Sequence, residues 1–224
     1  MLPSNKIVIS LGGSVINPSK PDISHIEEFA GILRKNPSKF IIFVGGGGLA
    51  RDFQKIASKN MEASHELLDE LGIIATKINA ELLKAKFGDI ADKNLILDPN
   101  KKLMLKRKVA VGGGWKPGAS TDDCAVRCAA ANNIRTIVNI SNTTHIYDKH
   151  PRKHMDAKPL TRTTWKVIQS LVGTEWIPGL NMPFDPIATK LAAKKKMKMV
   201  FLGPSLKNFS NYLSGKEFEG TVVD

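Results

Sequence analysis

The glycine residues of this chain gather in three clusters that could bind phosphate groups. Four of them stand in a row from Gly45 to Gly48, between an apolar run and Arg51, and the other clusters are Gly12–Gly13 and Gly112–Gly114. Glycine loses more backbone entropy on folding than any other residue, so a row of four needs a reason. A flexible loop is one explanation, and a tight turn whose N–H groups approach a ligand closely is the other. Such turns bind anions, above all where a helix follows.

Polar and cationic side chains accompany these clusters and favour a site for phosphoryl transfer. They are Ser14, Arg51, Lys116, Ser120 and Thr121. Neither the G-x-x-x-x-G-K-[ST] pattern of a P-loop nor the G-x-G-x-x-G pattern of a dinucleotide fold occurs. The residues show no Ser-His-Asp or Cys-His arrangement, and the histidine and cysteine spacing predicts no metal site. Each glycine turn alone is more simply structural, but the three together indicate a ligand with several phosphates, or two phosphorylated ligands side by side.

Strand-like and helix-like segments alternate along the chain. The predicted strands cover Lys6–Leu11, Lys39–Val44, Lys108–Val111, Ile134–Ile140, Met197–Leu202 and a short Gly220–Val223. The predicted helices cover Asp22–Leu33, Leu49–Lys59, Met61–Phe87 with a bend near Gly72, a stretch capped by Ser120 or Thr121 that runs to about Ala131, Thr163–Leu171 and Pro186–Lys196. This alternation predicts an α/β fold with a largely parallel sheet. Ligands of such sheets bind beyond the carboxyl ends of the strands, where the glycine turns would gather.

The composition indicates a globular protein with an anionic partner. The chain has 224 residues, of which 42% are hydrophobic and 24% charged, and its net charge is +12. This charge suits nucleic acid, a membrane surface or phosphorylated small molecules. Because aromatic residues make up only 6%, stacking on single-stranded bases has little support, and we expect no nucleic-acid partner. No apolar run approaches the roughly 20 residues that span a bilayer, so we expect no membrane partner. The N-terminus lacks a signal-peptide pattern, which makes a cytoplasmic location the default expectation.

Seven segments, in order along almost the whole chain, resemble a known family. They are ISLGGSVI (9–16), VGGGGLAR (44–51), DELGIIATKINAELL (69–83), GGGWKPGASTD (112–122), the degraded segment SNTTHIYDKHPR (141–152), AKPL (157–160) and PFDPIATKLA (183–192). The chain resembles the amino acid kinase superfamily and, within it, the archaeal-type uridylate (UMP) kinases. The resemblance implies a three-layer αβα sandwich and transfer of the γ-phosphoryl group of ATP, with Mg²⁺, to UMP. It also implies one domain over residues 1–224, with an acceptor-binding lobe over about 1–135 and an ATP-binding lobe over about 136–224.

The same resemblance assigns roles to individual residues. UMP would be bound by Gly45, Gly46, Gly47, Arg51, Asp69, Gly114, Lys116, Pro117, Gly118, Ser120 and Thr121. ATP would be bound by Gly12, Gly13, Ser14, Ser141, Asn142, Tyr147, Asp148, Arg152 and Lys190. The catalytic residues would be Asp122, Lys190 and Ser14, with no protein-held metal beyond the Mg²⁺ that accompanies ATP. A homo-oligomer is expected, either a dimer or a hexamer built as a trimer of dimers.

One further stretch carries two possible meanings. The apolar positions of the long predicted helix are Leu67, Leu68, Leu71, Ile74, Ile78 and Leu82. We interpret this stripe most simply as core. In the enzymes that the chain resembles, however, a long helix near this position builds a dimer.

The chain departs from the family pattern at two places. Many superfamily members carry a lysine that contacts the transferred phosphoryl group where this chain has Ser10, so Lys116 or Lys190 would have to supply that charge. Thr144 and His145 replace an acidic residue and a glycine in the segment that binds the donor nucleotide, which leaves the preferred donor open. Two alternatives therefore stand beside UMP kinase: another small-molecule kinase of the superfamily, and a nucleotide sensor with weak catalysis.

Overall fold

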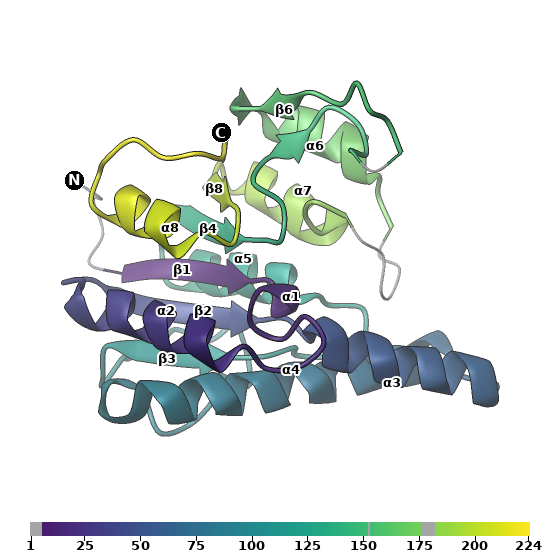
Figure 1. The fold of residues 1–224 in the computed structure, drawn as a ribbon, viewed down its shortest axis with the longest axis horizontal. Coiled ribbons are helices and arrows are strands. Elements are labelled where there is room, and N and C mark those ends of the chain that lie inside the picture. Colours follow the sequence, from purple (N-terminus) through teal and green to yellow (C-terminus); the bar gives the residue numbers. More distant parts are fainter. Residues whose placement is uncertain (1–5, 152, 176–181) are drawn as a thin grey trace.

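A seven-stranded sheet runs through the computed structural model, which describes residues 6–151, 153–175 and 182–224. The strand order is β3-β2-β1-β4-β8-β9-β7, and neighbours are parallel except for the antiparallel pair β8 and β9 (Figure 1). The strands of this sheet are β1 Lys6–Leu11, β2 Lys39–Val44, β3 Val109–Gly112, β4 Thr136–Ile140, β7 Arg162–Thr163, β8 Lys198–Leu202 and β9 Thr221–Val223. A separate small sheet pairs β5 Ile146–Tyr147 with β6 Pro159–Leu160.

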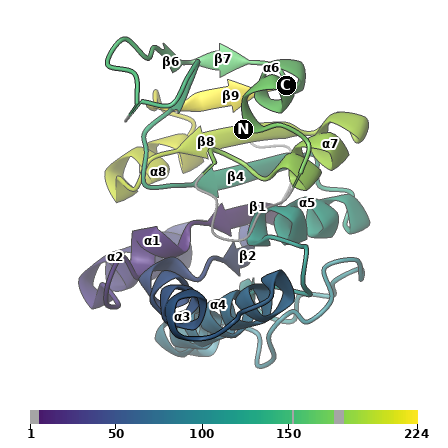
Figure 2. The same ribbon diagram turned by 90° about the vertical axis from the view of Figure 1, so that its right-hand side faces the viewer.

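Helices cover both faces of the large sheet, as Figure 2 shows. They are α1 Gly13–Ile16, α2 Ile23–Lys35, α3 Gly47–Asn60, α4 His65–Phe87, α5 Thr121–Ala131, α6 Trp165–Val172, α7 Pro186–Lys194 and α8 Leu206–Leu213, with a 3₁₀ turn at Gly88–Ile90. Helices α2, α4 and α8 bury their apolar sides against one face, and α5, α6 and α7 bury theirs against the other. The predicted α/β fold with three layers and a largely parallel sheet is therefore confirmed.

The two-residue period of the strands decides which side chains meet which helices. In β1, Ile7, Ile9 and Leu11 belong to the core under α2, and Val8 belongs to the core under α5. Ser10 follows Val8 by two residues and so faces α5 as well. In β4, Ile137 lies in the core under α5, so Asn139 faces the same helix. The parallel register pairs Ser10 with Asn139, which brings two polar side chains together near the carboxyl ends of the central strands.

The predicted element bounds differ from the structure mainly at α3, α4 and α8. Strands β1 and β2 match their predicted bounds, whereas α3 starts two residues early because Gly47 and Gly48 form its first turn. Helix α4 begins at His65 rather than at Met61 and runs through Gly72 without interruption. Helix α8, capped by Ser205, was not predicted. No helix among the described residues is long and apolar enough to cross a membrane.

The interpretation of the α4 apolar stripe as core is wrong at Ile74 and Ile78, whereas Leu82 does pack against the core. Ile74 and Ile78 are 55% and 53% exposed. The buried residues of α4 are instead Ala75, Thr76, Asn79, Ala80, Leu83 and Phe87. The side chains nearest the glycine turns, Ala75, Thr76 and Asn79, are small or polar. The turns approach the helix too closely for larger residues.

Candidate active site

Three cavities lie beyond the carboxyl ends of the parallel strands. We name each by one residue that lines it. The Arg51 cavity has a volume of about 610 Å³, the Asp122 cavity about 180 Å³ and the Tyr147 cavity about 290 Å³. The Asp122 cavity shares Ser14, Gly45 and Thr121 with the first, and Ser141, Met182 and Pro183 with the third. These shared residues place the Asp122 cavity between the other two.

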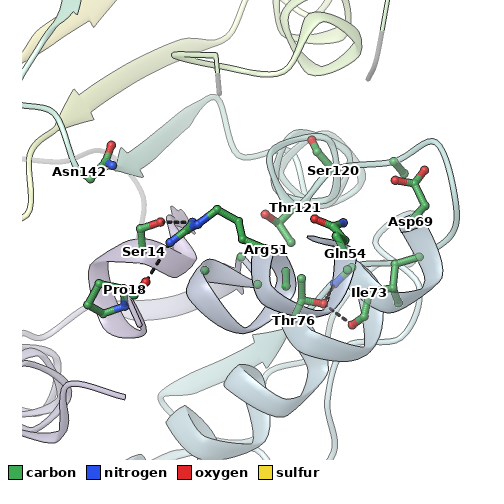
Figure 3. A pocket seen from close by; sticks show the side chains of 17 residues that line it. Ser14, Pro18, Arg51, Gln54, Asp69, Ile73, Thr76, Ser120, Thr121 and Asn142 are labelled. Atoms are coloured by element: carbon green, nitrogen blue, oxygen red, sulfur yellow. Dashed lines mark hydrogen bonds between the residues drawn. The ribbon is translucent and has the colours of Figure 1, made fainter. Parts of the chain in front are cut away.

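Arg51 projects from α3 across the mouth of the first cavity, as Figure 3 shows. Its guanidinium donates from Nη1 to Ser14 Oγ at 2.8 Å and from Nη2 to the Pro18 carbonyl oxygen at 2.9 Å. Both acceptors are neutral, and the Arg51 side chain is exposed. An anion entering the cavity would therefore meet a positive charge whose described contacts include no carboxylate.

The four glycines after β2 allow two turns to touch through their backbones. A Cβ on Gly13 would lie 2.2 Å from the Gly47 nitrogen, and one on Gly47 would lie 2.4 Å from the Asn17 carbonyl oxygen. Gly47 also has a φ of +63°, a backbone conformation that residues other than glycine rarely adopt. Close contact between the β1 and β2 turns thus explains part of the glycine cluster before any ligand is considered.

A buried side chain on α4 holds this pair of turns in place. Asn79, which is 1% exposed, donates from Nδ2 to the carbonyl oxygens of Gly45 at 2.8 Å and Gly46 at 3.1 Å. Its Oδ1 accepts a hydrogen bond from Asn17 Nδ2 at 3.0 Å. Since carbonyl groups away from water need donors, Asn79 satisfies the turn after β2, and its contact with Asn17 links that turn to the segment after β1.

The loop that leads from β3 to α5 is tied to α4 by two further contacts. Thr76 Oγ1 accepts from the Gly114 N–H at 2.6 Å and donates to the Ile73 carbonyl oxygen at 2.6 Å. Closer to the solvent, Asp69 Oδ2 accepts from the Gly118 N–H at 2.7 Å. The loop therefore closes one side of the Arg51 cavity, which Asp69, Thr76 and Gly114 line (Figure 3).

Asp122 lies in the first turn of α5, which Ser120 caps by accepting the Asp123 N–H at 3.1 Å. Its Oδ1 accepts from Ser10 Oγ at 2.5 Å and from Asn139 Nδ2 at 2.9 Å. Burial raises the pKa of Asp122 to about 7, while the Ser10 hydrogen bond opposes this rise and the nearby Asp185 carboxylate adds to it. The central cavity thus holds a carboxylate bound by neutral donors.

The Tyr147 cavity lies between the small sheet and the segment that enters α7. Ser141, Asn142 and Tyr147 line it, together with apolar surface from Leu171 and Met182. His145 and His150 also reach it, so its wall mixes apolar, aromatic and polar groups. Such a mixed wall suits a flat heterocycle attached to a polar chain.

Most of the residues predicted for the site line one of these cavities. They are Gly12, Gly13, Ser14, Gly45, Gly46, Gly47, Arg51, Asp69, Gly114, Ser120, Thr121, Asp122, Ser141, Asn142 and Tyr147. Arg152 lies outside the described residues.

Five predicted residues lie elsewhere in the structure. Lys116, Pro117 and Gly118 are exposed, and Lys116 Nζ lies 4.4 Å from the centre of the Trp115 ring. Asp148 turns to the small sheet, where its Oδ1 accepts from the Lys158 N–H at 2.8 Å. Lys190 is exposed on α7 and donates to the Thr174 carbonyl oxygen at 3.4 Å. The structure therefore does not bring Lys116 or Lys190 to the Asp122 cavity, because the one stacks on an indole and the other lies on the solvent side of its helix.

Several residues of the site carry no assignment from the sequence. Gln54 lines the Arg51 cavity and donates to the Leu68 carbonyl oxygen at 2.9 Å, and Asn139 contacts Asp122. Asn79 lies within the segment DELGIIATKINAELL that carries the family resemblance, although no role was assigned to it. Asn139 could have been found as a polar interruption of a buried strand, in register with Ser10. Among the described residues, no three His, Cys, Asp or Glu side chains form a group that could hold a metal ion.

Comparison with known proteins agrees with this geometry. Residues 5–203 match the model of the amino acid kinase family. A uridylate kinase from Pyrococcus abyssi is 33% identical over 98% of this chain and 99% of its own length, and one from Methanococcus aeolicus is 30% identical over 98% and 99%. The crystal structure of uridylate kinase from Archaeoglobus fulgidus superposes with a TM-score of 0.82 at 29% identity, covering 98% of this chain and all of that one. The resemblance drawn from the motifs is thereby confirmed: the chain belongs to the amino acid kinase family.

Proposed function

We propose that the protein transfers the γ-phosphoryl group of Mg-ATP to UMP and releases UDP. The observation that carries this proposal is the row of three cavities, with a carboxylate in the middle one and an arginine at the mouth of an outer one. Two nucleotides laid end to end need such a row, since their phosphates must meet in line. The full-length relatives named as uridylate kinases support UMP as the acceptor.

UMP would occupy the Arg51 cavity. Its phosphate would displace Ser14 and Pro18 from Arg51, whose two nitrogens would then bind two phosphate oxygens. The first turn of α3 adds N–H groups that have no acceptor within the helix. Asp69 would accept hydrogen bonds from the ribose hydroxyls, and the loop containing Gly114 would cover the nucleotide. Lys116, Pro117 and Gly118 would take part only after that loop moves.

ATP would place its nucleoside in the Tyr147 cavity and its phosphates in the Asp122 cavity. Ser141, Asn142 and Tyr147 would contact the nucleoside, and Gly12, Gly13 and Ser14 would face the phosphates. Mg²⁺ enters with ATP as part of the substrate, bound mainly by phosphate oxygens and water, as this ion prefers. Asp122 would orient that cation beside the transferred group.

The protein's contribution to the reaction is alignment and charge neutralisation. The phosphoryl group passes between two oxygens in line, so no covalent intermediate with the protein is required. Arg51, the helix N-termini and the Mg²⁺ of the donor would offset the repulsion between the two anions. Lys190 would contribute only by leaving Thr174 and turning inward. Within this scheme, residues of about 1–135 bind the acceptor and those of about 136–224 bind the donor.

A homo-oligomer belongs to the same proposal. The exposed Ile74 and Ile78 on α4 support it, because large apolar side chains at half exposure favour burial by a partner. A second copy of the chain packed on α4 would cover them. The cytoplasmic location stays a prediction from the N-terminal sequence.

A direct assay tests the proposed reaction. Purified protein with Mg-ATP should convert UMP to UDP faster than it phosphorylates CMP, isopentenyl phosphate or acetylglutamate. Faster turnover of one of the other acceptors would favour a different kinase of the family. Saturable binding of UMP without any turnover would instead favour a nucleotide sensor.

A further inference from the structure

Two buried polar side chains beneath Asp122 stand where the fold alone would favour apolar ones. Ser10 is 2% exposed and Asn139 is 5% exposed, and both lie within central strands. Their neighbours on the same face, Val8 and Ile137, are fully buried and apolar. Burying a hydroxyl or an amide costs free energy unless it finds a hydrogen-bond partner. The partner that both residues find is Asp122.

The contacts fix the Asp122 carboxylate from one side. Ser10 Oγ at 2.5 Å and Asn139 Nδ2 at 2.9 Å both donate to the same oxygen, Oδ1. The parallel register holds the two donors side by side, and α5 lies over β1 and β4 (Figure 2). Two donors on one oxygen restrict rotation of the carboxylate and leave Oδ2 outside these two contacts. All three residues line the Asp122 cavity.

The other groups near Asp122 do not replace these donors. Asp185, the N-cap of α7, is an acidic neighbour whose Oδ1 accepts the Ala188 N–H at 2.6 Å, and its backbone N–H adds a hydrogen bond to Asp122. Asp123 turns away and pairs with Arg127 at 2.6 Å. The described contacts of Asp122 therefore include no cation, and its carboxylate is held by neutral donors, of which Ser10 and Asn139 are the two side chains.

We propose that Ser10 and Asn139 are positioning residues for phosphoryl transfer, which act by fixing Asp122 so that its second oxygen faces the phosphates. This inference rests on the proposed function and adds the means by which Asp122 is oriented. It gives Ser10 a role of its own, distinct from that of a cation in contact with the transferred group. Because a small displacement of a group near the reacting atoms can lower the rate greatly, kcat is the quantity that should respond.

A double-mutant cycle on the full-length protein tests the inference. Ser10→Ala should lower kcat for UMP by at least about tenfold, with the KM for UMP within about twofold of wild type. In the Asp122→Ala background, which leaves no side-chain oxygen for Ser10 to contact, the same Ser10→Ala change should have little further effect on kcat. Ser10→Thr, which keeps the hydroxyl, should retain most of the activity. Ser170→Ala, an exposed serine on α6 whose hydroxyl donates to the Val167 carbonyl oxygen, serves as the control and should match wild type.

Each other result has a defined meaning. A wild-type kcat in Ser10→Ala would overturn the inference, and so would equal losses in both backgrounds, since Ser10 would then act without Asp122. The unfolding midpoints of wild type, the two single variants and the double variant show whether the hydrogen bond between Ser10 and Asp122 contributes to stability. Coupling in stability without coupling in kcat would mark it as structural only and would also overturn the inference. If wild type failed to convert UMP to UDP in the direct assay, the proposed function itself would be rejected, and that assay comes before the variants are compared.

Discussion

Single residues in this site are held by neutral partners that a charged substrate can replace. Arg51 is the clearest case, because its two nitrogens contact a hydroxyl and a carbonyl oxygen. Exchanging these for phosphate oxygens replaces two neutral acceptors with anionic ones, so that both partners of each hydrogen bond are charged and the grip can be bidentate. The ligand-free contacts therefore place the guanidinium correctly without offering it a competing anion.

Removing the Arg51 guanidinium should weaken UMP binding. We expect Arg51→Ala to raise the KM for UMP at least about tenfold, because a hydrogen bond to a charged group contributes roughly 1.5–3 kcal/mol. The KM of Arg51→Lys should lie between those of wild type and Arg51→Ala, since lysine keeps the charge but loses the two-pronged geometry. Steady-state kinetics with UMP varied at saturating Mg-ATP gives the values. Lys55→Ala, an exposed cation on the same helix, should leave the KM unchanged, and an unchanged KM in Arg51→Ala would remove that residue from the site.

The raised pKa of Asp122 should make the stability of the nucleotide-free protein depend on pH. The folded-state pKa of Asp122 is raised to about 7, mainly by burial, from the ordinary aspartate value of 3.8. The folded protein thus holds this proton more tightly than the unfolded chain. The resulting stabilisation is fully present below the unfolded pKa and is lost as the pH rises through about 7.

Asp122→Asn isolates this contribution because an amide does not titrate. We expect the unfolding free energy of the variant, relative to wild type, to increase by about 1–2 kcal/mol between pH 5 and pH 8. Each pKa unit corresponds to about 1.4 kcal/mol, and water in the open cavity reduces the full value. Urea unfolding at both pH values measures it. Parallel pH profiles for the two proteins would show that Asp122 titrates normally.

At the scale of elements, the long apolar strands were predicted most accurately, whereas the two-residue strands β5, β6 and β7 were not predicted. β1 and β2 match their predicted bounds because continuous apolar runs ended by glycine leave one interpretation. The exposed face of α4 was misassigned because Ile74 and Ile78 follow helical periodicity as well as core residues would. Only the packing of Ala75 and Asn79 against the glycine turns reveals which face is buried.

The candidate site shows the same division. Arg51 and Ser120 were predicted from the glycine turns that they accompany, and Asp122 was predicted from the family resemblance. The directions of Lys116 and Lys190 were not, because long side chains on exposed positions choose between several acceptors. Nor did the sequence pair Asn79 with the turn at Gly45, since that contact joins residues 34 apart.

The contact between α4 and the glycine turns gives a prediction at this scale. Asn79→Ala removes the donor for two carbonyl groups, so the unfolding free energy should fall by about 1–3 kcal/mol. The KM for UMP should rise as well, because the turn that faces the phosphate loosens. Asn60→Ala, whose amide only contacts Ile56 within its own exposed helix end, should change stability by less than about 0.5 kcal/mol. Normal stability and KM in Asn79→Ala would show that the two turns hold each other without α4.

At the scale of the whole molecule, the exposed apolar residues of α4 remain to be covered. Ile74 and Ile78 lie on the opposite side of α4 from the buried Asn79, so the helix that supports the active site also presents an apolar surface outward. A single exposed isoleucine needs no explanation, but two at adjacent turns of one helix form a stripe. Self-association through α4 would bury this stripe and place the subunit contact one helix diameter from the acceptor site.

Charged substitutions on that stripe should therefore separate the subunits. We expect wild type to sediment as a dimer or larger assembly, and Ile74→Glu/Ile78→Glu to sediment as a monomer at the same micromolar concentration. Burying two carboxylates in an apolar contact costs far more than the contact gains, whereas the same residues are well solvated in a monomer. Leu97→Glu, a substitution at a residue that is 71% exposed and lies outside α4, controls for added negative charge and should leave the assembly intact. If the double variant sedimented like wild type, the subunits would have to meet through another surface, and the apolar stripe of α4 would have no part in assembly.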